Sequence, residues 1–312
     1  MKFEKIVIQF DDKNTILAEE LICDIFFSFN LKGVVCDVPL YEEDRPDEVF
    51  GLDTITKTEV NSITGFLPLI DSSESILEQI KEKALDLARF DINVNIKTEI
   101  IDEKEWSESW KKYFEVTKIT DRITVKPEWK DHIATENEVV IHLDPGMAFG
   151  TGTHPTTYMC IRLMETFFEP GSDFLDIGTG SGILMITAAK LGAKSITGID
   201  NDEVAVKVAG YNLKRNSIAS TKFHLECSTL ERMDIKKYDF IAVNIIAQVI
   251  VDIMPEISKR MTKDTITILS GIIKERQNEV LTSLETHSLD VIHEEYVDEW
   301  VALAVRKKRS IL

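Results

Sequence analysis

A glycine-rich turn between two acidic residues is the part of this sequence whose residue types could do chemistry. Asp176 precedes the turn GTGSG at 178–182, and Asp200 follows it after a predicted helix and strand. Glycines permit a tight turn and let a ligand approach the backbone closely. An acid at the end of the next strand can accept hydrogen bonds from two ribose hydroxyls. The pattern therefore predicts a site for a cofactor that contains a nucleoside.

The spacing of the glycines favours S-adenosylmethionine over NAD. Gly182 arrives one residue earlier than the third glycine of the dinucleotide fingerprint GxGxxG. The carboxylate of Asp176 would repel a pyrophosphate, whereas it suits the sulfonium and amino groups of S-adenosylmethionine. An NAD-linked oxidoreductase is the alternative from another enzyme class.

The elements that must position these residues alternate between helix and strand, which is typical of a doubly wound sheet. They are predicted at 156–168, 173–177, 181–190, 195–199, 202–216, 221–226, 238–243, 246–260, 265–270 and 274–286. Ligands of such sheets bind at the carboxyl ends of the strands, so we expect Gly178, Asp200 and Asn244 to surround one pocket. Two final strands, at 289–297 and 300–306, predict a hairpin with one antiparallel strand, which NAD-binding sheets usually lack. We therefore predict an α/β fold with a doubly wound, seven-stranded, Rossmann-like methyltransferase sheet.

The first hundred residues predict a separate small domain. Strands at 3–10, 34–38, 61–67 and 92–100 and helices at 15–30 and 72–89 give the order βαββαβ, the ferredoxin-like α+β pattern. Because this pattern carries no chemical constellation, we assign it to substrate recognition. The predicted domains are a substrate-recognition domain at 1–100, a linker helix and connector at 101–128, and an S-adenosylmethionine-dependent methyltransferase domain at 129–312.

The composition is typical of a soluble chain with two domains: 312 residues, of which 44% are hydrophobic and 29% charged. A net charge of −18 argues against direct nucleic-acid binding through phosphates and favours a basic protein partner. No apolar run approaches the roughly 20 residues of a membrane span, and the acidic N-terminus is unlike a signal peptide, so we predict a cytoplasmic protein. The spacing of its four cysteines indicates neither a disulfide framework nor a metal site.

Four stretches of the chain resemble one family closely. They are DPGMAFGTGTHPTT at 144–157, LDIGTGSGIL at 175–184, VNIIAQVIVDIMPEI at 243–257 and LSGII at 269–273. The sequence resembles the ribosomal protein L-eleven methyltransferases (PrmA), cytoplasmic bacterial enzymes that methylate lysine side chains and the N-terminal amine of a large-subunit ribosomal protein. The resemblance extends from Trp106 to the C-terminus, while Phe3–Phe10 lacks the tryptophan common in that family. A methyltransferase of the same fold that acts on another protein or on a small molecule is therefore an alternative.

The resemblance implies which residues form the site. Thr157, Gly178, Asp200 and Asn244 match the cofactor-contact positions of the family. The loop that contains Gly146, Gly150 and Gly152 is expected to close over bound cofactor. The complete predicted cofactor site consists of Phe149, Gly150, Thr151, Thr157, Asp176, Gly178, Gly180, Gly182, Asp200 and Asn244.

The implied chemistry requires few functional groups. Methyl transfer from a sulfonium to an amine is an in-line displacement, which requires a deprotonated nitrogen, alignment and exclusion of water. Asn244 stands where many amine methyltransferases orient the attacking nitrogen; its alternative role is to cap the helix that follows. His154 is the candidate base, and its alternative role is a structural hydrogen bond to the loop. A non-catalytic ribosome-assembly factor with an intact pocket is a further alternative.

Overall fold

The computed structural model describes residues 2–11, 15–29, 31, 34–37, 61–69, 73–102, 115–143 and 154–308. The chain divides into two compact units, Met1–Glu115 and Val116–Leu312. Phe149, Gly150 and Thr151 of the predicted cofactor site and the predicted linker helix lie outside the described residues. Among the helices of the described ranges, none has the length and apolar character to cross a membrane.

The first unit is a four-stranded antiparallel sheet with two helices. Its strand order is β2-β3-β1-β4, and each neighbouring pair is antiparallel. The elements are β1 (Lys2–Phe10), α1 (Thr15–Ser28), β2 (Val35–Asp37), β3 (Asn61–Pro68), α2 (Ser73–Leu85) and β4 (Val94–Asp102). Ile6, Ile8 and Phe26 are buried between sheet and helices, because alternate strand residues point to the same face. The predicted βαββαβ order is confirmed, although α2 ends at Leu85 and continues as a short 3₁₀ helix, η3 (Asp86–Phe90).

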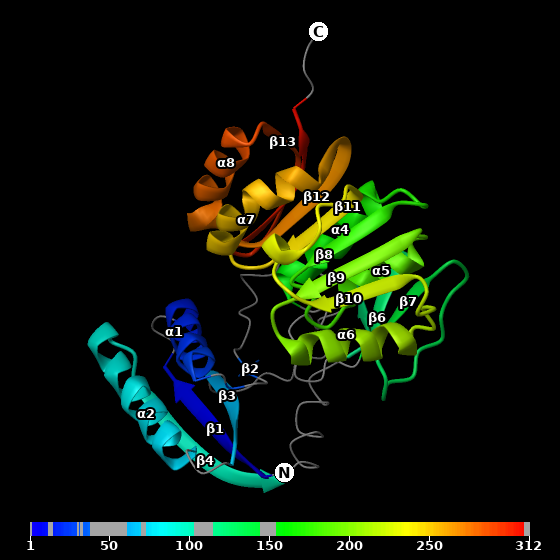
Figure 1. Ribbon diagram of the computed structural model, residues 1–312. Coiled ribbons are helices and arrows are strands. Elements are labelled where there is room, and N and C mark those ends of the chain that lie inside the picture. The colour runs from blue at the N-terminus through cyan, green and yellow to red at the C-terminus, as the bar shows by residue number, and fades with distance from the viewer. Residues whose placement is uncertain are drawn as a thin grey trace. The chain divides into compact units, whose positions relative to one another are not determined.

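The second unit is built on a seven-stranded sheet of order β10-β9-β8-β11-β12-β14-β13 (Figure 1). Its strands are β8 (Asp173–Ile177), β9 (Ser195–Asp200), β10 (Phe223–Cys227), β11 (Tyr238–Asn244), β12 (Met261–Ile273), β13 (Leu289–Val297) and β14 (Trp300–Lys307). β14 is antiparallel to both of its neighbours, whereas the pairs from β10 to β12 are parallel. The predicted doubly wound sheet with its antiparallel terminal strand is confirmed.

Helices cover both faces of this sheet (Figure 1). They are α4 (Pro155–Phe167), α5 (Ile183–Lys190), α6 (Glu203–Arg215), α7 (Ala247–Arg260) and α8 (Gln277–Thr286). Phe174 and Phe240 pack against α4 and α5, whereas their neighbours Leu175 and Ile241 pack against α7 and α8. A strand buried on both faces must be apolar at successive positions, which is why these strands read as continuous apolar runs.

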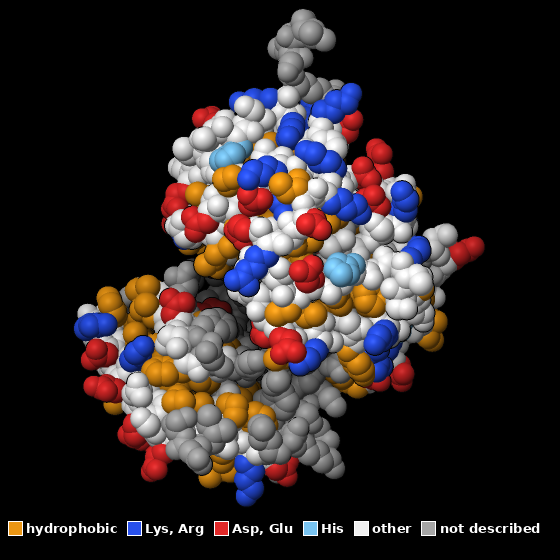
Figure 2. All heavy atoms as spheres, viewed as in Figure 1, with side chains coloured by type: hydrophobic (Ala, Val, Ile, Leu, Met, Phe, Trp, Pro, Cys, Tyr) orange, Lys and Arg blue, Asp and Glu red, His pale blue; other side chains and the backbone are white. Residues whose placement is uncertain are grey.

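A small three-stranded sheet precedes the large one. It contains β5 (Thr117–Lys118), β6 (Ile123–Pro127) and β7 (Val139–Leu143); β5 is antiparallel to β6, and β6 is parallel to β7. Ile119 lies in the turn between β5 and β6 and donates its N–H to the Ile123 carbonyl at 2.9 Å. Figure 2 shows acidic and basic side chains interspersed over the face in view.

A buried arginine at the end of α7 ties this helix to the loop that follows β10. The Arg260 guanidinium is fully buried and donates to the carbonyl oxygens of Leu230 at 2.7 Å and Met233 at 2.8 Å. It also pairs with Glu256 Oε2 at 2.9 Å. The same loop contacts the candidate site, because Ser228 N–H donates to the Asp200 carbonyl at 2.9 Å.

Replacement of this arginine should destabilise the unit strongly. In Arg260→Leu the two carbonyls lose their buried donors, and we expect the free energy of unfolding to fall by about 3 kcal/mol. Lys259→Leu is the matched control: Lys259 bridges the same Glu256 at 2.6 Å but is 54% exposed, so its loss should cost at most about 1 kcal/mol. Urea titration compares the two variants. Equal losses would show that the buried guanidinium has no special part in stability.

Candidate functional site

The glycine turn after β8 adopts the left-handed backbone conformation at each of its glycines. The φ angles are +73° at Gly178, +52° at Gly180 and +80° at Gly182. The N–H groups of Gly178 and Thr179 both donate to the carbonyl of Ile199 at 2.9 Å, which anchors the turn to β9. A side chain in this conformation costs roughly 1–2 kcal/mol, so glycine is required here for backbone reasons. The predicted helix start at 181 is wrong for the same reason, because α5 begins only after Gly182.

Asp200 at the end of β9 is fixed by two backbone hydrogen bonds. Its Oδ2 accepts from the N–H of Gly180 at 2.9 Å, and its Oδ1 accepts from the N–H of Asp202 at 3.0 Å. A carboxylate has about four lone-pair sites, so each oxygen retains one that could accept a ribose hydroxyl. The carboxylate is therefore held at the glycine turn and oriented before any ligand arrives.

Asp176 is buried beside the turn and only partly satisfied. Its Oδ2 accepts from the Thr179 hydroxyl at 2.8 Å, while its buried Oδ1 has no hydrogen-bond donor among the described residues. Burial, and to a lesser extent the negative charge of Asp200, raise the pKa of Asp176 to about 7, although hydrogen bonds with the Thr179 hydroxyl and the Met185 backbone oppose the shift. A buried acceptor without a donor suits a cationic N–H group, because a charge-assisted hydrogen bond would restore the charged form.

The raised pKa of Asp176 predicts how stability depends on pH. Between about pH 4 and about pH 7 the folded chain retains the proton on Asp176, whereas the unfolded chain, in which the pKa is 3.8, has lost it. The free energy of unfolding therefore falls as the pH rises across this range. Asp176→Asn removes this pH dependence. The free energy of unfolding of the variant, measured relative to that of wild type, should therefore increase from pH 4 to pH 7 and then remain constant. Denaturant titrations at several pH values, with Asp202→Asn as the exposed control, measure it. A difference independent of pH would contradict the prediction.

A second pair of predicted residues meets on the other side of the turn. Asn244 at the end of β11 donates its Nδ2 to the hydroxyl of buried Thr157 on α4 at 3.3 Å. Its Oδ1 is buried and accepts no hydrogen bond within the described parts of the chain. The cap of α7 is Ile246, without a side-chain hydrogen bond, so Asn244 does not cap that helix. The amide oxygen is thus the group that Asn244 presents to a ligand.

His154 begins α4. Its Nδ1 accepts from the Thr156 N–H at 3.3 Å and lies 2.8 Å from the Thr156 hydroxyl, so the imidazole is the N-cap of the helix. Burial lowers the pKa of His154 to about 4, which makes the ring neutral and weakly basic at pH 7. The ring of Trp300 meets it edge to face, with centroids 5.1 Å apart.

Sequence reasoning missed three residues of this site. Thr179 holds Asp176, Trp300 contacts His154, and Ile245 lies against the glycine turn. Thr179 stood inside the predicted turn and could have been found from its hydroxyl. The contacts of Trp300 and Ile245 join segments far apart in the chain, so neither had a local signal.

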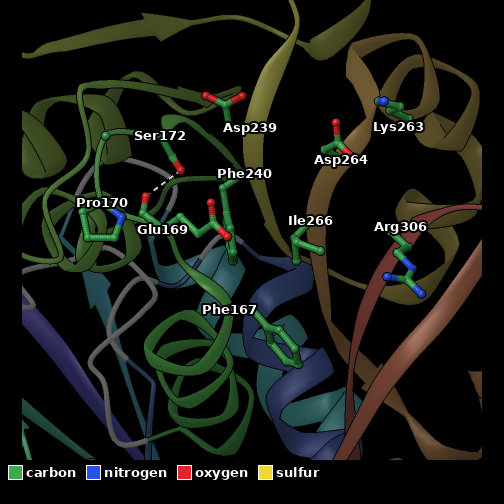
Figure 3. Close-up of a pocket in the computed structure, with 11 residues that line it drawn as sticks. Phe167, Glu169, Pro170, Ser172, Asp239, Phe240, Lys263, Asp264, Ile266 and Arg306 are labelled. Atoms are coloured by element: carbon green, nitrogen blue, oxygen red, sulfur yellow. Dashed lines mark hydrogen bonds between the residues drawn. The ribbon is translucent and has the colours of Figure 1, made fainter.

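A pocket of about 460 Å³ lies at the amino ends of the strands, opposite the carboxyl ends that carry Asp176, Asp200 and Asn244 (Figure 3). Ser172, Asp239 and Asp264, at the amino ends of β8, β11 and β12, line it together with Lys263 and Arg306. Asp239 is engaged structurally, since its Oδ2 accepts from the N–H of Asp173 at 2.9 Å. Ligands of doubly wound sheets bind at the carboxyl ends, so the candidate site is the one around Asp176, Asp200 and Asn244.

Comparison with known proteins agrees with this architecture. The family model "Ribosomal protein L11 methyltransferase (PrmA)" matches residues 3–308. A ribosomal protein L11 methyltransferase of Desulforapulum autotrophicum is 46% identical over 303 residues, which cover 97% of this chain and 98% of the relative. That of Desulfosudis oleivorans is 37% identical over 308 residues, 97% of each chain.

A solved structure is also similar. The crystal structure of the ribosomal protein L11 methylase from Lactobacillus delbrueckii subsp. bulgaricus aligns with a TM-score of 0.59 at 30% identity, over 62% of this chain and 100% of that one. The family match spans both units, including the N-terminal unit whose first strand departs from the family pattern. The chain belongs to the ribosomal protein L11 methyltransferase (PrmA) family.

Proposed function

We propose that this protein transfers methyl groups from S-adenosylmethionine to amine nitrogens of a protein substrate, ribosomal protein L11. The observation that carries the proposal is a pair of buried oxygens, Asp176 Oδ1 and Asn244 Oδ1, which have no donor among the described residues. They stand at the carboxyl ends of the neighbouring strands β8 and β11, in a chain that belongs to a methyltransferase family. Each is an acceptor suited to an N–H group of a ligand.

The cofactor residues fit S-adenosylmethionine better than a dinucleotide. When bound, this cofactor supplies an electrophilic methyl group on a sulfonium. Asp176 would accept from its ammonium group, and Asp200 would accept from the ribose hydroxyls. Gly180 keeps Asp200 oriented through its N–H. The same buried Asp176 carboxylate would repel the pyrophosphate of NAD, so the proposal excludes the oxidoreductase.

Asn244 would orient the acceptor amine. Its Nδ2 is engaged by Thr157, which leaves Oδ1 to accept from an amine N–H and align the nitrogen lone pair. The amine attacks in its deprotonated form, the C–N bond forms as the C–S bond breaks, and the proton lost from nitrogen passes to water. His154 is a weak base with its Nδ1 engaged by Thr156, so we assign it to holding the start of α4.

The substrate assignment draws on relatives and on charge. Relatives covering nearly the whole chain are named for ribosomal protein L11. A net charge of −18 favours encounter with a basic protein over nucleic acid. We assign recognition of the substrate to the N-terminal unit, lysine side chains or the N-terminal amine as acceptors, and the cytoplasm as the place of action.

Calorimetric titration with S-adenosylmethionine, followed by transfer of labelled methyl groups to purified L11, tests the proposal. We expect binding with one molecule of cofactor per chain and label on L11 alone in a mixture of large-subunit proteins. Binding with label on another protein or on none would remove L11 as the substrate. No binding of S-adenosylmethionine together with binding of NAD would overturn the proposal as a whole.

A further inference from the structure

Two glycines, Gly178 in the turn after β8 and Gly271 in β12, enclose the same residue, Ile245. A β carbon on Gly178 would lie 2.6 Å from Cγ2 of Ile245. One on Gly271 would lie 2.3 Å from the Ile245 carbonyl oxygen and 2.7 Å from its carbonyl carbon. Real β carbons do not approach so closely, so both positions have room only for hydrogen, and it is Ile245 that fills the space.

The backbone of Ile245 is fixed from the β12 side. Its N–H donates to the Ser270 carbonyl at 3.1 Å, which continues the pairing of β11 with β12 one residue past Asn244. The Ser270 hydroxyl in turn donates to the Thr156 carbonyl on α4 at 3.1 Å. Gly271, at φ +82°, lies within the register shift of β12 against β14, and a β carbon there would meet the Ile245 backbone.

The side chain of Ile245 is fixed from the β8 side. Its Cγ2 rests on Gly178, the first glycine of the turn that holds Asp176 and contacts β9. Asn244 directly precedes Ile245, so a shift of Ile245 would move the Asn244 amide relative to that turn. The two halves of the candidate site therefore meet at one residue.

We propose that Ile245 is a positioning residue: packed between Gly178 and Gly271, it sets the position of Asn244 relative to the glycine turn. This inference rests on the proposed function, because it assigns a role within the same site. Ile245 acts through Asn244 and the turn, and its side chain need not touch the reacting atoms. It also gives Gly178 a reason to be glycine beyond its φ angle, namely the methyl group of Ile245.

A double-mutant cycle tests the contact. Gly178→Ala should raise the Kd for S-adenosylmethionine by at least about tenfold, because the added methyl group displaces the turn or Ile245. Adding Ile245→Ala makes room for that methyl group and should restore affinity by at least about fivefold, as expected for residues in contact. The backbone strain of alanine at 178 is the same in both backgrounds, so the cycle isolates the contact.

Gly182→Ala is the matched control. Gly182 belongs to the same turn and has φ +80°, but its β carbon would meet Ala209 at 3.0 Å. Ile245→Ala should not restore Gly182→Ala. Additive effects for Gly178→Ala and Ile245→Ala, or equal rescue of both glycine variants, would overturn the inference.

The turnover number kcat distinguishes a positioning role of Ile245 from a purely structural one, because a residue that only contributes packing would leave kcat unchanged. Ile245→Ala should lower kcat by roughly 10- to 100-fold below its melting temperature, with a smaller change in cofactor KM. Ile245→Val retains the Cγ2 methyl group and should restore kcat. Wild-type kcat in Ile245→Ala would overturn the inference. If the wild-type protein does not bind S-adenosylmethionine, the proposed function is wrong. The contact between Gly178 and Ile245 can then still be tested by measuring the melting temperatures of the same variants.

Discussion

Asp200→Asn should raise the Kd for S-adenosylmethionine by about 100-fold, since at least two hydrogen bonds to a charged acceptor, each worth about 1.5 kcal/mol, are lost. Each carboxylate oxygen already accepts one backbone N–H, from Gly180 and from Asp202. An asparagine amide would direct its NH₂ group at one of these donors and present a donor to the ribose. One of these two backbone N–H groups would thus lose its acceptor at the same time as the ligand loses its own. Isothermal titration calorimetry measures the effect.

The neighbouring acid supplies the control for this prediction. Asp202 caps α6 by accepting the Val204 N–H at 2.8 Å, and asparagine is as good an N-cap as aspartate. Asp202→Asn should therefore leave both the melting temperature and the cofactor Kd near their wild-type values. If Asp200→Asn binds within about threefold of wild type, the assignment of Asp200 to the ribose is wrong.

Asn244→Ala should lower kcat by roughly 100-fold and should change the Kd for the cofactor much less, because alignment of the attacking nitrogen matters mainly in the transition state. The amide is held by Thr157 at 3.3 Å, which leaves Oδ1 as its free acceptor within the described residues. Thr157→Val removes that hold and should lower kcat in the same direction but by less. Steady-state kinetics with L11 at saturating cofactor measures kcat for each variant.

Asn278→Ala is the control for the same substitution at an exposed position on α8, and it should leave kcat unchanged. The effects of Thr157→Val and Asn244→Ala on kcat can also be compared with the effect of combining them. Because Thr157 acts through Asn244, the double variant Thr157→Val/Asn244→Ala should be no slower than Asn244→Ala alone. Additive losses would mean that Thr157 has a separate role, and an Asn244→Ala enzyme with wild-type kcat would remove Asn244 from the mechanism.

The sequence by itself determined the features that depend on short stretches of chain. The apolar run before Gly178, the glycines of the turn and the acid at Asp200 all lie within one strand–helix–strand unit, so local rules were enough to predict their elements and their proximity. Apolar patterning and the final hairpin predicted the seven-stranded sheet with its antiparallel strand. The ferredoxin-like order of the first unit followed from the same patterns.

The tertiary structure alone decided how the strand ends meet. Thr157 and Asn244 lie 87 positions apart, and their hydrogen bond exists because α4 packs across β12 and β11. Ile245 is enclosed by a glycine of the turn after β8 and a glycine of β12, and these two strands are neighbours of β11 only in the folded sheet. A parallel sheet joins its strands through helices, so residues at adjacent strand ends are always distant in sequence. Local pattern therefore predicts each strand end but not the contacts between them.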